Sequence, residues 1–310
     1  MAALVATFVV GALAACSQVL GINADRHLAV DSAPDAGVEA EAAAPAGPWD
    51  CLSDPPETFP ANLNTTVTLL TVDSLQPILT AQAVDGGSGL VEIQYTPLTN
   101  IPVRACPTVY DPTCAKGVPA PPGWNNSGDA GMATFTLPNS FGGYFQFADD
   151  AGLFTTSFYA SQLMAGDTTD TIAATMLPLS ATIGLEAVLQ GVHLDHDTDG
   201  GLGHILLTVF DCHDHSAPGV YFTPSQVASP GGMYQTQIFY TVGTGGSSSE
   251  IPSTTAMSTD NSGTGGILNV PAGEINVKAF RYSDNAPIGV INLLVPPGTA
   301  ASAILRVRTH

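Results

Sequence analysis

In the stretch Met132–Pro138, MATFTLP, every second residue from Ala133 onward is apolar and threonines stand between them. Ala133, Phe135 and Leu137 fall on one face of an extended chain, and Met132, Thr134 and Thr136 fall on the other. Such a period of two residues predicts a β-strand with one face buried. Segments with β-branched or aromatic residues occur on both sides of it, at 66–72, 89–95, 102–106 and 144–148. The region around MATFTLP therefore predicts a sheet.

Composition favours β-structure along the whole chain of 310 residues, because 32 Gly and 24 Pro suit short strands joined by turns. Hydrophobic residues make up 45% of the chain and charged residues 11%, which is unlike a disordered polyelectrolyte. The formal net charge of −20 repels phosphate backbones and anionic headgroups. We therefore expect no nucleic-acid partner and no basic patch that docks on lipid.

The order of segments around MATFTLP resembles that of carboxypeptidase regulatory-like domains, which are transthyretin-like β-sandwiches. The matching positions are Asp129, Gly131, Phe135, Leu137, Pro138 and Gly142 or Gly143, between PVRAC at 102–106 and YFQF at 144–147. A second match about 130 residues later runs from HILLTVFDC at 204–212 to Asp260, Gly263, Leu268, Val270, Pro271, Gly273 and INVKAF at 275–280. The resemblance implies a mainly β protein with two tandem sandwiches, over 49–170 and 171–310, and no peptidase activity.

One helical pattern interrupts this organisation. Ile183, Ala187 and Val188, or Leu185 and Leu189, recur at helical spacing after Ser180, a residue suited to a helix N-cap. We expect a short helix over 180–190, packed near the junction of the two sandwiches.

The N-terminal segment predicts export. An apolar run over 2–15 ends in Leu-Ala-Ala-Cys at 13–16, and at about 21 Å as a helix it is too short to cross a bilayer. This ending resembles the lipobox of bacterial lipoproteins, which implies cleavage after residue 15 and acylation of Cys16. Residues 16–48 are rich in Ala, Pro and acidic residues, as a disordered tether is. The resemblance implies an outer-membrane or cell-surface lipoprotein, attached to the membrane through its lipid; an ordinary cleaved signal peptide is the alternative.

Four further cysteines, Cys51, Cys106, Cys114 and Cys212, allow three disulfide pairings. Cys106 and Cys114 flank PTVYDPT, whose Pro and Asp favour a turn, so we expect this local pair. Cys51–Cys212 follows by elimination. Neither pair has CxxC spacing, which disfavours redox chemistry and cysteine-ligated zinc.

One cluster, GVHLDHDTDGGLGH followed by DCHDH, is suggestive of metal chemistry. Asp195, Asp197 and Asp199 before Gly200 are spaced like the start of a calcium loop, but Leu206 occupies the twelfth position, where such a loop needs Glu. His213 and His215, with His193 or Asp195, suggest zinc. The alternative for both is a solvated acidic loop and an exposed turn.

The sequence thus leaves two functional hypotheses. The first is a non-catalytic surface lipoprotein with a structural or binding role, whose partner is a glycan or an envelope protein. The second is a calcium- or zinc-dependent binding protein or hydrolase centred on His193–His215. Aromatic residues for a sugar-stacking platform are present, although residues of this kind also fill sandwich cores; they are Trp124, Tyr144, Tyr159, Tyr221, Phe222, Tyr234 and Tyr240.

Overall fold

The computed structural model describes residues 47–53, 64–81, 91–111, 113–118, 125–128, 131–138, 141–148, 157–160, 170–176, 185–186, 189, 191–197, 201–213, 215–228, 233–243 and 250–306. The predicted signal peptide, the acylation site Cys16 and the tether up to residue 46 lie outside these residues. Within them, no helix is long and apolar enough to span a bilayer.

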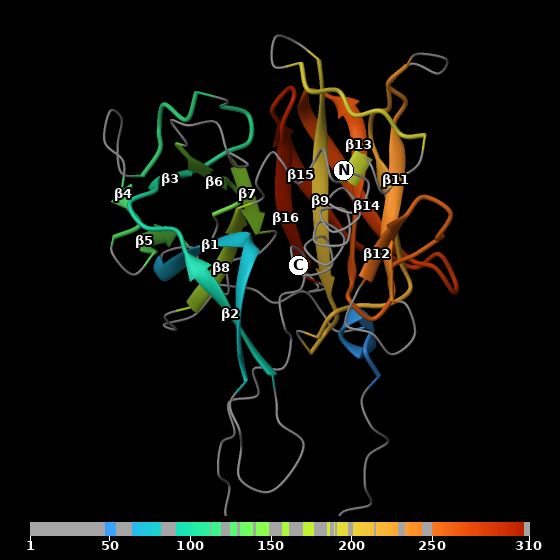
Figure 1. The fold of residues 1–310 in the computed structure, drawn as a ribbon, viewed down its shortest axis with the longest axis horizontal. Helices are drawn as coiled ribbons and strands as arrows, with labels where there is room; N and C mark the ends of the chain where they lie inside the picture. The colour runs from blue at the N-terminus through green and yellow to red at the C-terminus, as the bar shows by residue number, and fades with distance from the viewer. Residues whose placement is uncertain are drawn as a thin grey trace, which may run out of the picture.

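Strands make up most of the described chain, which confirms the mainly β prediction (Figure 1). In the first half, the described residues form the 3-10 turn η1 (Asp50–Ser53) and the strands β1 (Asn64–Ala81), β2 (Val91–Pro97), β3 (Pro102–Cys106), β4 (Asn125–Asn126), β5 (Met132–Pro138), β6 (Tyr144–Phe147), β7 (Ser157–Ala160) and β8 (Asp170–Met176). The second half contains β9 (Leu202–Phe210), β10 (Val220–Pro224), β11 (Gln237–Gly243), β12 (Glu250–Ser253), β13 (Thr264–Pro271), β14 (Gly273–Arg281), β15 (Pro287–Val295) and β16 (Ala300–Arg306).

Of the helix expected over 180–190, the structure describes three residues. Leu185 and Glu186 are helical, and the Leu189 N–H donates to the Leu185 carbonyl at 2.9 Å. MATFTLP forms β5 with the predicted alternation: Ala133, Phe135 and Leu137 are buried.

The strands form three sheets. One has four strands, in the order β2-β1-β5 with β8 parallel to β1; the second has three, in the order β10-β14-β15. The third has nine strands, in the order β12-β11-β13-β9-β16-β7-β6-β3-β4. Strands from both halves of the chain thus belong to one continuous sheet.

The junction in this sheet is made by β16, the last strand, which runs parallel to β9 on one side and to β7 on the other. Figure 1 shows the result as two sandwiches side by side, with β16 near the middle. The predicted boundary between residues 170 and 171 falls at the start of β8, which pairs with β1. The division into two domains at this point stays a prediction.

Each sandwich has its own core, but both cores take side chains from the other half. The first core, between the four-stranded sheet and β3 and β6, includes Phe210 and Ile304 from the second half. The second core, between the three-stranded sheet and β9, β13 and β16, includes Cys106, Val109, Cys114 and Tyr144 from the first half. The two sandwiches are therefore packed together as well as hydrogen-bonded.

β9 lies at the centre of this arrangement and is covered on both faces. Ile205, Leu207 and Val209 point into the second core, whereas Leu206 packs with Leu185, Leu189, Val192 and Leu194 on the opposite face. Every residue of β9 after Leu202 is buried. This is why its sequence is a continuous apolar run rather than an alternating one.

Candidate functional site

Both predicted disulfides are present. Cys106 is bonded to Cys114 and Cys51 is bonded to Cys212, with sequence separations of 8 and 161 residues. The first closes the loop that follows β3, hereafter the disulfide loop (106–114). This loop lies on the face of the nine-stranded sheet that also carries the three-stranded sheet, since Cys106, Val109 and Cys114 pack into the second core.

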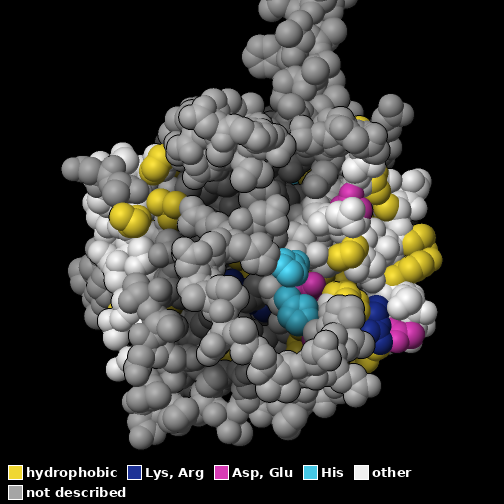
Figure 2. All heavy atoms as spheres, turned by 90° about the horizontal axis from the view of Figure 1, so that it is seen from below, with side chains coloured by type: hydrophobic (Ala, Val, Ile, Leu, Met, Phe, Trp, Pro, Cys, Tyr) yellow, Lys and Arg dark blue, Asp and Glu magenta, His cyan; other side chains and the backbone are white. Residues whose placement is uncertain are grey.

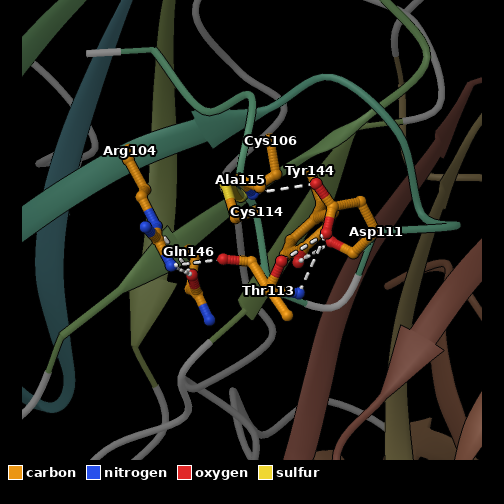
Figure 3. Close-up of a disulfide and its surroundings, with 8 residues drawn as sticks. All are labelled: Arg104, Cys106, Asp111, Thr113, Cys114, Ala115, Tyr144 and Gln146. Atoms are coloured by element: carbon orange, nitrogen blue, oxygen red, sulfur yellow. Dashed lines mark hydrogen bonds between the residues drawn. A yellow bond between two sulfur atoms is a disulfide. The ribbon is translucent and has the colours of Figure 1, made fainter. Parts of the chain in front are cut away.

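Hydrogen bonds to Asp111 fix the shape of the disulfide loop (Figure 3). The Asp111 carboxylate accepts the Thr113 hydroxyl at 2.6 Å and the backbone N–H groups of Thr113 and Ala115 at 3.2 and 2.8 Å. The hydrogen bond from the Thr113 side chain, and those from the backbone, lower the pKa of Asp111 below its usual range. The carboxylate is therefore ionised at neutral pH and holds the turn together.

Side chains of β3 and β6 also make hydrogen bonds to this loop. The Arg104 guanidinium donates to Gln146 Oε1 at 2.6 and 2.8 Å, and to the Thr113 carbonyl at 3.1 Å. The Tyr144 hydroxyl donates to the Asp111 carbonyl at 3.4 Å, and burial raises the pKa of Tyr144. Gly143 lies so close to the loop that a Cβ there would be 1.7 Å from the Cys106 carbonyl oxygen, so only glycine fits. These contacts hold the described residues of the loop against β3 and β6.

A groove of about 200 Å³ lies between the disulfide loop and the strands β14 and β15. Its lining residues are Val109, Tyr110, Ser225, Glu274, Ile275, Asn276, Asn292 and Leu293. Val109 is buried, whereas the neighbouring Tyr110 is 69% exposed. Val109 and Tyr110 come from the first half of the chain and the other lining residues come from the second, so both halves form the groove.

The strand side of the groove presents a pair of amide side chains. Asn276 on β14 and Asn292 on β15 are opposite each other, and Asn276 Nδ2 donates to Asn292 Oδ1 at 2.6 Å. Ser225 fixes the backbone here: its Oγ accepts the Asn276 N–H at 3.0 Å, and its own N–H donates to the Asn276 carbonyl at 2.8 Å. The lining residues that the structure describes include one carboxylate, Glu274, and no Lys, Arg or His. Such a surface suits a neutral polar ligand.

The predicted metal ligands near residue 195 lie in different environments. His193 Nδ1 is 3.3 Å from Glu186 Oε1, and His196 Nε2 is 3.8 Å from Glu186 Oε2. Asp195 is buried, and its carboxylate accepts the backbone N–H groups of Asp197 and Leu202. Asp197 is exposed and Asp199 lies outside the described residues.

His213 and His215 follow the other end of β9, which is Phe210. His213 Nε2 is 3.4 Å from Asp50 Oδ1, and His215 Nδ1 is 3.8 Å from Asp211 Oδ2. The centres of the two rings are 6.3 Å apart. Figure 2 shows histidine next to acidic side chains on the face of the molecule seen from below. In the described part of the chain, no group of three His, Cys, Asp or Glu side chains is arranged to hold a metal ion. The calcium or zinc site, which includes Asp199, stays a prediction.

A buried polar network that the sequence did not indicate surrounds His204. Its Nε2 donates to the Asp195 carbonyl at 3.1 Å, and its Nδ1 accepts the Asn269 N–H at 3.2 Å. Burial lowers the pKa of His204 from 6.5 to about 4. Asn269 Nδ2 donates to the carbonyls of His193 and Gln235, and Oδ1 accepts the Asp195 N–H. These groups hold the segment 193–197 against β9 and β13.

The aromatic residues that the sequence suggested for a sugar-stacking platform lie in different environments. Tyr144, Phe222 and Tyr240 are buried in the second core, and Tyr221 stacks on Phe280 at 5.3 Å. Tyr234 is exposed, Trp124 lies outside the described residues, and the side chain of Tyr159 is not described. Tyr110, which lines the groove, was missed. Its position in PTVYDPT, between the two cysteines of the local pair, was the signal that could have pointed to it.

No protein-family model matches the chain, and a search of curated proteins finds no match. Among solved structures, the chain is similar to the TIE protein of Bacillus anthracis (11% identity, TM-score 0.22), covering 80% of this chain and about a third, 34%, of that protein. It is also similar to the shaft pilin SpaA of Lactobacillus rhamnosus GG (13%, TM-score 0.22, 79% and 98% covered) and to GBS52, the minor pilin of Streptococcus agalactiae (14%, TM-score 0.21, 79% and 96% covered). Likenesses this weak carry no argument about function.

Proposed function

We propose that this chain is an exported lipoprotein, anchored through Cys16, which displays a rigid non-catalytic β-body with a binding role at the cell surface. The observation that carries the proposal is the Cys51–Cys212 disulfide, which joins the N-terminal entry of the body to the end of its central strand. This covalent joint suits a protein that is held by its N-terminus.

Several contacts reinforce the disulfide at the entry point. The Cys212 N–H donates to the Pro48 carbonyl at 3.1 Å, and His213 Nε2 lies 3.2 Å from the Gly47 carbonyl oxygen. Cys212 lies two residues after the end of β9, which pairs with β13 and β16 on its two sides. A force on the N-terminal segment is therefore transmitted through the disulfide to β9. Because β9 is hydrogen-bonded along both edges, its neighbouring strands resist that force together with it.

Two disulfides also support an oxidising compartment, because thiols are kept reduced in the cytosol. The net charge of −20 supports attachment by acyl chains rather than by a basic surface. Ser17, next to the acylation site, agrees with an outer-membrane destination under the lipoprotein resemblance. These observations favour display outside the cytoplasm.

The test of this proposal is metabolic labelling with an alkyne fatty acid, followed by fractionation. We expect the wild-type chain to carry the label and to sediment with membranes, and Cys16→Ser to lose the label and appear in the soluble exported fraction. The matched control is the double variant Cys51→Ser/Cys212→Ser, which should keep the label because it leaves Cys16 intact. An unlabelled, full-length wild-type chain in the cytosol would contradict the proposal.

A further inference from the structure

We propose that the groove between the disulfide loop and β14–β15 binds one ring of a neutral saccharide. This inference deepens the proposed function, since it names the class of ligand that the displayed body would bind. It rests on three features of the groove: an exposed aromatic ring on a loop held by a disulfide and hydrogen bonds, a pair of amides with spare hydrogen-bonding capacity, and described lining residues that include no cation.

The aromatic ring is that of Tyr110. A tyrosine at 69% exposure offers an apolar ring face and a polar hydroxyl, and the C–H face of a sugar ring can stack on such a surface. Tyr110 is next to the buried Val109 and to Asp111, whose carboxylate accepts two hydrogen bonds from Thr113 in the same loop and one from Ala115 just after it. Because the backbone on both sides is fixed, ligand binding orders little beyond the side chain itself, which lowers its entropic cost.

The amide pair is oriented before any ligand arrives. The hydrogen bond from Asn276 Nδ2 to Asn292 Oδ1 assigns the roles of the remaining atoms. Among the described residues, Asn276 Oδ1 and Asn292 Nδ2 have no other partner, so one acceptor and one donor group lie next to each other. Two neighbouring hydroxyls of a sugar, each both donor and acceptor, match that arrangement.

Charge and size narrow the class of ligand. Among the described residues of the lining, Glu274 is the only charged one, and the chain has a net charge of −20, so uronic acids, sialic acids and phosphorylated sugars are repelled. Pockets for drug-sized ligands have volumes of about 300–1,000 Å³. A groove of about 200 Å³ is smaller and open, and it fits one ring of a longer or terminal glycan.

The test measures saccharide binding to the full-length mature chain by saturation-transfer NMR and isothermal titration. The probes are glucose, galactose, N-acetylglucosamine, cellobiose and diacetylchitobiose, with glucuronic and N-acetylneuraminic acids as anionic counterparts. We expect millimolar binding of at least one neutral probe and none of the anionic ones. Tyr110→Ala and Asn292→Ala should each weaken that binding about tenfold or more.

Two variants separate recognition from folding. Tyr110→Phe keeps the ring face and should stay within about threefold of wild type, because it loses only a hydroxyl. Tyr282→Ala is the matched control: Tyr282 is also an exposed aromatic residue, at 50%, but it lies against Tyr221 and does not line the groove. It should bind as wild type does.

The proposal is overturned if no neutral probe binds, if anionic probes bind better, or if Tyr110→Ala binds as tightly as wild type. Binding only to a protein or peptide from the envelope would overturn it as well. Failure here differs from failure of the proposed function, because fatty-acid labelling of Cys16 does not depend on the groove. A labelled, membrane-bound chain without saccharide affinity would leave the anchoring proposal intact.

Discussion

At the scale of single residues, the most consequential side chain is the buried His204. It is neutral in this environment, because its Nδ1 faces a donor, the Asn269 N–H, and so has to stay an unprotonated acceptor. Protonation would put a second hydrogen opposite that donor and a charge in the core. The nearby His196, 6.3 Å away between ring centres, adds to the cost of the charge.

We expect acid to destabilise the protein through His204. Between pH 6.5, its ordinary pKa, and the folded value of about 4, the unfolded chain binds a proton that the folded chain does not. Stability due to this group is therefore complete above pH 6.5 and falls as the pH drops towards 4, by about 3 kcal/mol in all. Urea unfolding of wild type and His204→Gln at pH 7.5 and 4.5 would measure it: the wild type should lose more stability than the variant. Equal losses would show that His204 does not titrate in this window.

Asn269 is a second residue whose role follows from its surroundings. Its φ of 55° lies at the bulge in β13, and its side chain makes three hydrogen bonds while being buried. Asn269→Ala would leave the Asp195 N–H and two carbonyls without partners, at a cost of about 3 kcal/mol. Asn269→Gly suits the backbone but loses the same bonds, so it should recover part of that cost. Chemical denaturation would rank the three proteins, and an Ala variant as stable as wild type would contradict the assigned role.

At the scale of elements, the two disulfides close loops of very different length. In the chain-entropy model, the stabilisation grows with the number of residues closed. Cys51–Cys212, with a separation of 161 residues, also fastens η1 to the end of β9, whereas Cys106–Cys114 closes only the disulfide loop. The first therefore stabilises the fold more than the second.

Removal of each disulfide should show this difference. We expect Cys51→Ala/Cys212→Ala to lose about 5 kcal/mol and Cys106→Ala/Cys114→Ala about 2–3 kcal/mol. The second variant should also weaken saccharide binding, since it loosens the support of Tyr110, whereas the first should leave binding unchanged while the protein is folded. Thermal melting of the two variants measures the loss of stability, and saccharide titration of the same samples measures binding. A larger loss of stability in Cys106→Ala/Cys114→Ala than in Cys51→Ala/Cys212→Ala would contradict the chain-entropy model.

At the scale of the whole molecule, the nine-stranded sheet makes the two halves depend on each other. β16 pairs with β7 and with β9, and each core contains side chains from the other half. Separate unfolding of one sandwich would expose Phe210 and Ile304, or Val109 and Tyr144, to water. The pairing and packing at the junction thus couple the stability of the two sandwiches.

We therefore expect the chain to unfold in one cooperative transition. In scanning calorimetry, the calorimetric enthalpy should equal the van't Hoff enthalpy, as it does for a single unit. Two tandem domains joined only by a linker would instead give two transitions. Two resolved transitions at neutral pH would contradict the coupling between the halves.

The sequence was sufficient for features that are local or periodic. Alternation in MATFTLP specified β5 and its buried face, and the turn-forming residues between Cys106 and Cys114 specified that disulfide. Gly131, at the predicted turn before β5, has a φ of 70° that favours glycine. The calcium or zinc site remains a prediction of the sequence, because Asp199 lies outside the described residues.

Only the tertiary structure decided how the two halves join and where a ligand would bind. A side-chain pattern records which face of a strand is buried, but the backbone groups at a strand edge are the same for every residue except proline. The parallel pairing of β16 with β7 could therefore not be read from either segment. The groove could not be predicted either, because Tyr110 and the pair Asn276–Asn292 are far apart in sequence. They meet because the disulfide loop of the first half packs against the three-stranded sheet of the second half.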